Sequence, residues 1–245
     1  MKHIIASLTL LSQFAIAQDK PDLTRWTESF GSEESFDANW SAYGWLPDGK
    51  TSSKKEDRPL WWELINSELR ARTSPGVHPS GMTRRVAGSD VRVSLRFKLP
   101  PQGLVGVGFN GPNRLLERSF HLAGVHIRET GISAWDEDNL YPKGSPEAEE
   151  LKKKGEMNRK FIGAAKVATL EIKQGVWHDF IMEMHGRDLK IILDGKEALT
   201  YTTNAGDAAK ETLQFSVHST MKEAVYGFFD EVKFEPLLTT PAPKP

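Results

Sequence analysis

The strongest constraint on the fold is a run in which apolar and polar side chains alternate. From Val91 to Leu99, Val, Leu or Phe occupies every second position, and Arg, Ser or Lys occupies each position between them. A period of two places all the apolar side chains on one face of a β-strand, so the run predicts a strand with one buried face in an antiparallel sheet. Such a strand must bury its apolar face against a second layer.

The same alternation recurs along the chain and is interrupted by Gly, Pro, Asn or Asp. Asp194-Gly195 is the dipeptide that accepts the positive φ angles of a tight hairpin turn, so residues 189–193 should pair with residues 197–203. Further strands are expected at 180–184, 213–217 and 225–234, and weaker candidates lie at 26–30, 61–72, 104–109, 119–128, 131–135 and 167–172. We therefore expect about eleven strands.

A single segment is typical of a helix. Ser145 can cap it, Pro146 suits its first turn, and a run of glutamates precedes a run of lysines up to Lys154. The charges indicate a solvated surface helix. Many short strands with one short surface helix predict an all-β fold, a two-sheet antiparallel jelly-roll sandwich.

The two ends of the chain differ in character from this alternating region. Residues 1–17 have a basic start, an apolar run and Ala15-Ile16-Ala17, which predict a signal peptide and hence a secreted or periplasmic protein. Residues 18–235 would form the sandwich domain, and residues 236–245 a proline-rich flexible tail. The chain has no cysteine, which excludes disulfides, thiolate zinc sites and cysteine nucleophiles.

Charge and hydropathy exclude two classes of partner. The net charge is −1, so no electrostatic attraction to nucleic acid is expected. After the leader no window contains the roughly 18 unbroken apolar residues that a membrane span needs. The sequence carries no signal for the oligomeric state.

Several motifs occur together in a recognisable order. They are Trp26 to Phe30, Phe36 with Trp40, Trp62-Glu63-Leu64-Ile65-Asn66 before Leu69, Ser80-Gly81-Met82-Thr83-Arg84, Trp177-His178-Asp179, Leu193-Asp194-Gly195-Lys196 and Phe229-Asp230-Glu231-Val232-Lys233-Phe234. In this order the chain resembles the concanavalin A-like lectin and glucanase superfamily. More narrowly, it resembles secreted bacterial 3-keto-disaccharide hydrolase-like domains.

This resemblance covers residues 26–235 and implies a jelly roll that binds or processes carbohydrate. It carries over no catalytic residue. Laminarinase-type glycosidases of the superfamily have Glu-x-Asp-x-x-Glu on a strand, a spacing that this sequence lacks, so a retaining glycosidase of that type is not expected.

Polar side chains on otherwise apolar strands are the first candidates for a sugar site, because the concave face of such a sandwich usually holds the glycan. Arg and His bind carboxylate, sulfate or hydroxyl groups with directed hydrogen bonds, and tryptophan rings pack on sugar rings. The predicted substrate-binding residues are Trp45, Arg84, Arg92, Arg96, His121, Arg128, Trp135 and His218. Ordinary solvent-facing or packing roles are the alternative for each. His121 and His126 differ in parity, so only a β-bulge could bring both to one metal ion.

An acidic segment follows Trp135 at the end of an expected strand. Because carboxylates and imidazoles act as general acids and bases, we predict His126, Asp136 and Asp138 as catalytic residues. A calcium loop and a plain acidic turn are the alternatives, although the spacing is not that of an EF-hand. Otherwise no cofactor and no metal site are predicted.

Three functions are consistent with these features. The first is a secreted carbohydrate-active enzyme, a glycoside hydrolase-like or lyase-like jelly roll acting on a di- or polysaccharide. The second is a non-catalytic glycan-binding or cell-surface module, and a structural domain of a secreted complex is a third. A jelly roll can serve any of them. Glycan-binding domains are more often attached to a catalytic domain, and no second domain is expected in this chain. This favours the enzyme.

Overall fold

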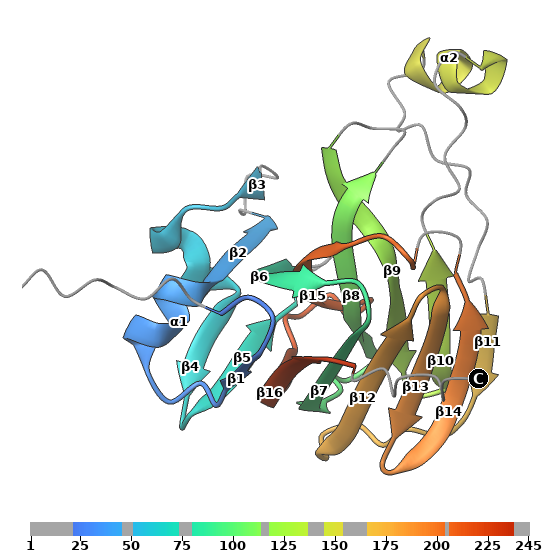
Figure 1. Ribbon diagram of the computed structural model, residues 1–245. Helices are drawn as coiled ribbons and strands as arrows, with labels where there is room; N and C mark the ends of the chain where they lie inside the picture. Colours follow the sequence, from blue (N-terminus) through green and yellow to red (C-terminus); the bar gives the residue numbers. More distant parts are fainter. Residues whose placement is uncertain are drawn as a thin grey trace, which may run out of the picture.

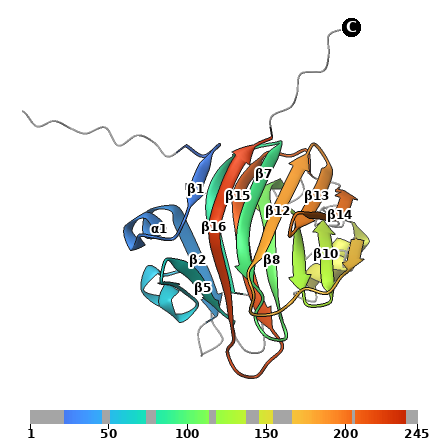
Figure 2. The same ribbon diagram turned by 90° about the horizontal axis from the view of Figure 1, so that it is seen from below.

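The computed structural model describes residues 22–45, 51–73, 80–113, 118–136, 145–153, 166–203 and 206–237. Their strands form two eight-stranded sheets in which all strand pairs are antiparallel, and the sheets pack face to face (Figures 1 and 2). This confirms the predicted all-β sandwich.

We call the first sheet sheet A. Its strand order is β14 (Lys196–Thr202), β13 (Asp188–Leu193), β12 (His178–His185), β7 (Val91–Lys98), β16 (Tyr226–Pro236), β5 (Glu68–Arg72) and β4 (Trp62–Ile65), with β1 (Trp26–Glu28) also paired to β16. Figure 2 shows β16, β7, β12 and β13 running side by side.

We call the second sheet sheet B. Its strand order is β11 (Lys166–Thr169), β10 (Gly131–Asp136), β9 (Arg118–Arg128), β8 (Gly103–Asn113), β15 (Lys210–Ser219), β6 (Ser80–Gly88), β2 (Trp40–Trp45) and β3 (Thr51–Ser52). The long central strands β8, β9 and β15 form the middle of this sheet.

The core lies between the two sheets. On β7 the side chains of Val91, Val93, Leu95 and Phe97 are buried and those between them are partly exposed, as the alternation predicted. Phe215 of β15 stacks on Phe229 of β16 with ring centroids 4.8 Å apart, which joins the two sheets. Burying these apolar faces supplies the main driving force for the fold.

The predicted hairpin forms between β13 and β14. Asp194 and Gly195 have φ angles of 49° and 76°, the left-handed values that a two-residue turn of this type requires. The Asp194 carboxylate accepts a hydrogen bond from the backbone N–H of Asp179 at 2.9 Å and lies 2.8 Å from His178 Nδ1. These contacts tie the turn to the start of β12.

Two short helices accompany the sheets, together with one 3-10 helix. The predicted surface helix is confirmed as α2 (Pro146–Lys153), which lies apart from the sheets in Figure 1. Helix α1 (Glu33–Asn39) was not predicted; Ser32 caps it, and it buries Phe36. The 3-10 helix spans Lys55–Leu60, and its Arg58 pairs with Glu33 and Asp37 of α1. None of the described helices is long and apolar enough to cross a membrane.

Two strands of the structure lie in segments where no strand was predicted. The segment around Arg84-Arg85 forms β6, and Tyr43-Gly44-Trp45 ends β2. The alternation of apolar and polar residues is interrupted in β6, because the charged residue Arg84 occupies one of its inward positions and is buried. In β2 the inward residues Trp40 and Ala42 give only two apolar positions. Both strands extend sheet B beyond β15.

Candidate functional site

The outer face of sheet B, which points away from the core, brings three rows of paired residues together. The first row is Tyr43, Gly81, Ser216, Gly106 and His126; the second is Thr83, Gln214, Gly108, Gly124 and Trp135; the third is Arg85, Thr212, Asn110 and His121. Each row crosses the sheet from strand to strand. Residues far apart in sequence therefore share one surface.

Glycines make the floor of this surface. A β-carbon at Gly124 would lie 2.4 Å from Cζ2 of Trp135, and one at Gly108 would lie 2.6 Å from the same atom. The indole ring therefore lies directly on the backbone of β8 and β9, in space that any larger residue would fill. In the next row, a β-carbon at Gly106 would lie 3.3 Å from Cδ2 of His126.

Trp135 lies between two imidazoles. Its ring centroid is 5.5 Å from that of His121 and 6.1 Å from that of His126, and the two histidines belong to the rows on either side of it. Trp135 is half-buried, so part of the ring remains open to solvent. An aromatic ring flanked by two acid–base groups suits a sugar that stacks on the ring.

A β-bulge puts both histidines on the same face. Asn110 pairs with His121 whereas Phe109 pairs with Ala123, so β9 holds one extra residue, Leu122, at this point. The bulge reverses the parity of His121 relative to His126. The sequence had indicated that only such a bulge could bring the two imidazoles together.

His126 is held in its neutral form. Burial lowers its pKa from 6.5 to about 4, and the charges of Arg128 and His218 in the adjacent row act in the same direction. The ring is therefore uncharged throughout the neutral pH range. A neutral imidazole can donate one hydrogen bond and accept another.

This pKa predicts a pH dependence of stability. The unfolded chain takes up a proton at His126 near pH 6.5, whereas the folded protein does so only near pH 4. Stability should therefore be full above pH 6.5 and fall between pH 6.5 and 4, by up to about 3 kcal/mol from this residue. We expect His126→Gln to flatten that part of a urea-unfolding pH profile.

The exposed His185 of sheet A provides the control for this prediction. His185→Gln should leave the pH dependence of stability unchanged, and equal pH dependence in all three proteins would refute the assignment to His126.

A chain of hydrogen bonds links His121 to Tyr43 across four strands. His121 Nδ1 lies 2.7 Å from Asn110 Oδ1, and Asn110 Nδ2 donates to Gln214 Oε1 at 3.2 Å and to Thr212 Oγ1 at 3.0 Å. Gln214 Nε2 donates to the Tyr43 hydroxyl oxygen at 2.8 Å. Tyr43 packs over Gly81, where a β-carbon would lie 2.2 Å from its hydroxyl oxygen. Burial raises the pKa of Tyr43, so it keeps its proton.

The outer face of sheet B carries positive rather than negative groups. Arg85 and Arg128 are exposed on it, and His218 lies in the same row as Arg128, with Leu104 between them. Among the described side chains at the paired positions of this face from β2 to β10, none is Asp or Glu; the side chain of Asp136, at the end of β10, lies outside the described part. The face therefore complements an anionic ligand.

Five of the predicted site residues gather here. His121, His126, Arg128, Trp135 and His218 all lie on the outer face of sheet B. Three predicted residues cannot be placed fully: the side chains of Trp45 and Asp136 and the whole of Asp138 lie outside the described part of the chain. The backbone of Asp136 pairs with Ala123.

Three predicted substrate-binding arginines lie elsewhere. Arg84 points into the core, where its Nη1 lies 3.0 Å from Glu28 Oε2. Arg92 and Arg96 lie on the outer face of sheet A, paired with Glu183 and Glu231 respectively, and Arg96 also lies over the ring of Trp177. The structure does not place them beside the histidines, because Arg84 points into the core and β7, which carries Arg92 and Arg96, belongs to the opposite sheet.

Asn110, Tyr43 and Gln214 were not predicted as site residues. Their role depends on which strands become neighbours, which no local pattern indicates. Among the described residues no group of three His, Asp or Glu side chains is arranged to hold a metal ion.

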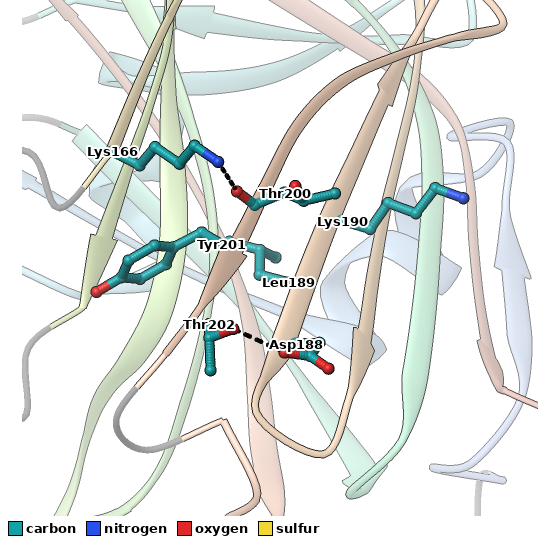
Figure 3. A pocket seen from close by; sticks show the side chains of 7 residues that line it. All are labelled: Lys166, Asp188, Leu189, Lys190, Thr200, Tyr201 and Thr202. Atoms are coloured by element: carbon teal, nitrogen blue, oxygen red, sulfur yellow. Dashed lines mark hydrogen bonds between the residues drawn. The ribbon is translucent and has the colours of Figure 1, made fainter.

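A pocket of about 530 Å³ lies away from this face, where β11 approaches β13 and β14 (Figure 3). It is lined by Lys166, Asp188, Leu189, Lys190, Thr200, Tyr201 and Thr202. Its polar groups bond to one another: Lys166 Nζ donates to the Thr200 carbonyl at 2.6 Å, and the Thr202 hydroxyl donates to Asp188 at 2.8 Å. No histidine lines it, so it lacks the acid–base groups of the outer face of sheet B.

Comparison with known proteins shows the fold. No family profile and no curated protein matches the sequence. Among solved structures, a sialidase matches over 89% of this chain with a TM-score of 0.58 and 12% identity, and the chain spans 19% of that protein. Alginate lyase AlyC3 matches over 85% of this chain and 95% of its own (TM-score 0.57, 10% identity), and a Bacillus licheniformis β-glucanase over 87% and 99% (TM-score 0.55, 10% identity). The chain thus has the concanavalin A-like jelly-roll fold of these carbohydrate-active enzymes.

Proposed function

We propose that this protein binds an acidic polysaccharide across the outer face of sheet B and cleaves it by β-elimination. The observation that carries the proposal is Trp135 between His121 and His126 over the glycines of β8 and β9, with basic but no acidic side chains among the described ones at the paired positions of the face. Residues 1–17, as a signal peptide, would place this activity outside the cytoplasm.

The chemistry of the face favours elimination over hydrolysis. Glycosidases generally use two carboxyl groups, one on each side of the bond, to protonate the leaving oxygen and to support an oxocarbenium-like transition state. Elimination from a uronic acid instead needs a base that removes the C5 proton. The C4–O4 bond then breaks, its oxygen takes up a proton, and a C4–C5 double bond forms. Imidazoles can supply such acid–base steps.

The positive groups supply the second requirement of elimination. The C5 proton becomes acidic enough only when the neighbouring carboxylate is neutralised by donors or cations. Arg128, Arg85 and the second N–H of the Gln214 amide, which is not used on Tyr43, are donors on this face. Neutral His126 can add a hydrogen bond without competing for the proton that the base removes.

The solved structures that share the fold bear the names of different carbohydrate-cleaving enzymes. One is named an alginate lyase, and others are named a sialidase and a β-glucanase, so both cleavage chemistries occur on this architecture. Resemblance to 3-keto-disaccharide hydrolase-like domains suggests a second substrate, in which the proton next to the C3 ketone would be removed. Hydrolysis with Asp136 and Asp138 is the competing enzyme mechanism, and a binding module the non-catalytic one.

A substrate panel with a stacking variant tests the proposal. We expect wild-type protein to bind acidic polysaccharides in preference to neutral ones and 3-keto-disaccharides, and to release unsaturated products detectable by mass spectrometry. Trp135→Ala should weaken binding about tenfold, the loss of one aromatic contact.

Trp177 on the outer face of sheet A provides the matched control, because it stacks with Arg96 and Lys98 rather than on the candidate site. Trp177→Ala should bind as the wild type does. Binding without any product would leave a binding module, and equal effects of both tryptophan variants would refute the site.

A further inference from the structure

The amide chain between His121 and Tyr43 has a direction. Asn110 presents its oxygen to His121 Nδ1 and its nitrogen to Gln214 Oε1; Gln214 presents its nitrogen to the Tyr43 oxygen. Since an amide oxygen can only accept, His121 must carry its proton on Nδ1 to complete the first bond. A neutral ring in this tautomer has its lone pair on Nε2.

A single amide cannot turn around within this chain. Rotating Asn110 alone would bring its oxygen against Gln214 Oε1 and its NH₂ group against the Nδ1–H of His121. The reverse direction requires both amides to rotate together, with Tyr43 donating to Gln214 and Asn110 donating to His121 Nδ1. The chain therefore has two self-consistent states, and the structure holds the one that runs from His121 to Tyr43.

The geometry points to Asn110 and Gln214 as positioning residues that make His121 the proton acceptor, through Nε2, and Tyr43 a hydroxyl donor to the bound glycan. Tyr43 is a donor because its oxygen already accepts from Gln214, which leaves its own proton to be directed elsewhere. His126 differs, since no hydrogen bond among the described residues orients its ring. This inference rests on the proposed function and assigns a separate role to each histidine.

The tautomer of His121 can be measured without any substrate. We would record long-range proton–nitrogen correlation NMR spectra of the full-length protein, well above the ordinary histidine pKa of about 6.5. The His121 signals are identified by their absence in His121→Gln. The inference predicts the tautomer with its proton on Nδ1, and a proton on Nε2 instead would overturn it.

Two variants of Asn110 separate positioning from general structural damage. Asn110→Leu removes the acceptor, so the tautomer should shift toward a proton on Nε2 and turnover should fall by roughly tenfold to a hundredfold. Asn110→Asp restores an acceptor and should restore the Nδ1 proton. Ser216→Ala, on the same face of the neighbouring strand, should leave the tautomer unchanged. An unchanged tautomer in Asn110→Leu would overturn the inference. The NMR measurement of the tautomer needs no turnover. Failure of this inference and failure of the proposed function are therefore distinguishable.

Discussion

Replacing His121 with alanine is expected to lower turnover of an acidic glycan by about 10²–10⁴-fold, the range typical of a lost general base. His121 lies beside Trp135 at 5.5 Å, and Asn110 holds its ring at 2.7 Å. Neither Trp135 nor Asn110 can take its place as a base. Because His121 is half-buried and outside the core, the free energy of unfolding should change little. Steady-state rates and urea unfolding, measured on the same preparation, check both parts.

His185 is the matched control for this variant. It is exposed at the end of β12 in sheet A, with its Nδ1 3.2 Å from Asp90 Oδ2. We expect His185→Ala to keep the wild-type rate. The assignment of His121 fails if the two alanine variants turn over substrate equally well.

The second large effect concerns stability. Glu28→Ala should lower the free energy of unfolding by about 3–5 kcal/mol, because it leaves the buried guanidinium of Arg84 without its partner. Arg84 is 9% exposed, its Nη1 lies 3.0 Å from Glu28 Oε2, and desolvation lowers its pKa. The same carboxylate accepts from Trp40 Nε1 at 3.2 Å and from the backbone N–H of Phe30 at 3.0 Å. One substitution thus breaks three interactions, two of which, with Arg84 and Trp40, join β1 to sheet B.

Denaturant unfolding measures this loss, and a surface carboxylate calibrates it. Glu33 also pairs with an arginine, Arg58, but its side chain is 59% exposed, so Glu33→Ala should cost less than about 1 kcal/mol. The double variant Glu28→Leu with Arg84→Met should recover part of the stability by replacing the pair with apolar groups. If Glu28→Ala costs no more than Glu33→Ala, the buried pair is not a structural element.

Local patterns predicted most of the fold because its central strands obey them. The alternation in β7 and the Asp194-Gly195 turn depend only on neighbouring residues, and both are confirmed. The prediction failed where tertiary contacts override the pattern. β6 contains Arg84 at an inward position, which is stable only because Glu28 reaches it from β1.

The candidate site was predictable only in part. His126, His121 and Trp135 were identified by residue type, since imidazoles and indoles suit sugar sites. Their arrangement depends on the bulge at Leu122 and on glycines in two strands, neither of which alternation indicates. Asn110 and Tyr43 come from strands that become linked through β15 and β6. Such cross-strand chains have no signature in a single sequence.

The most direct test of the proposed chemistry is the fate of solvent oxygen during cleavage. An acidic oligosaccharide would be digested by the full-length protein in isotopically labelled water, and the products analysed by mass spectrometry and ultraviolet absorbance. Elimination adds no water, so we predict unlabelled products with a new C4–C5 double bond. Saturated products that carry the label would show hydrolysis and contradict the account.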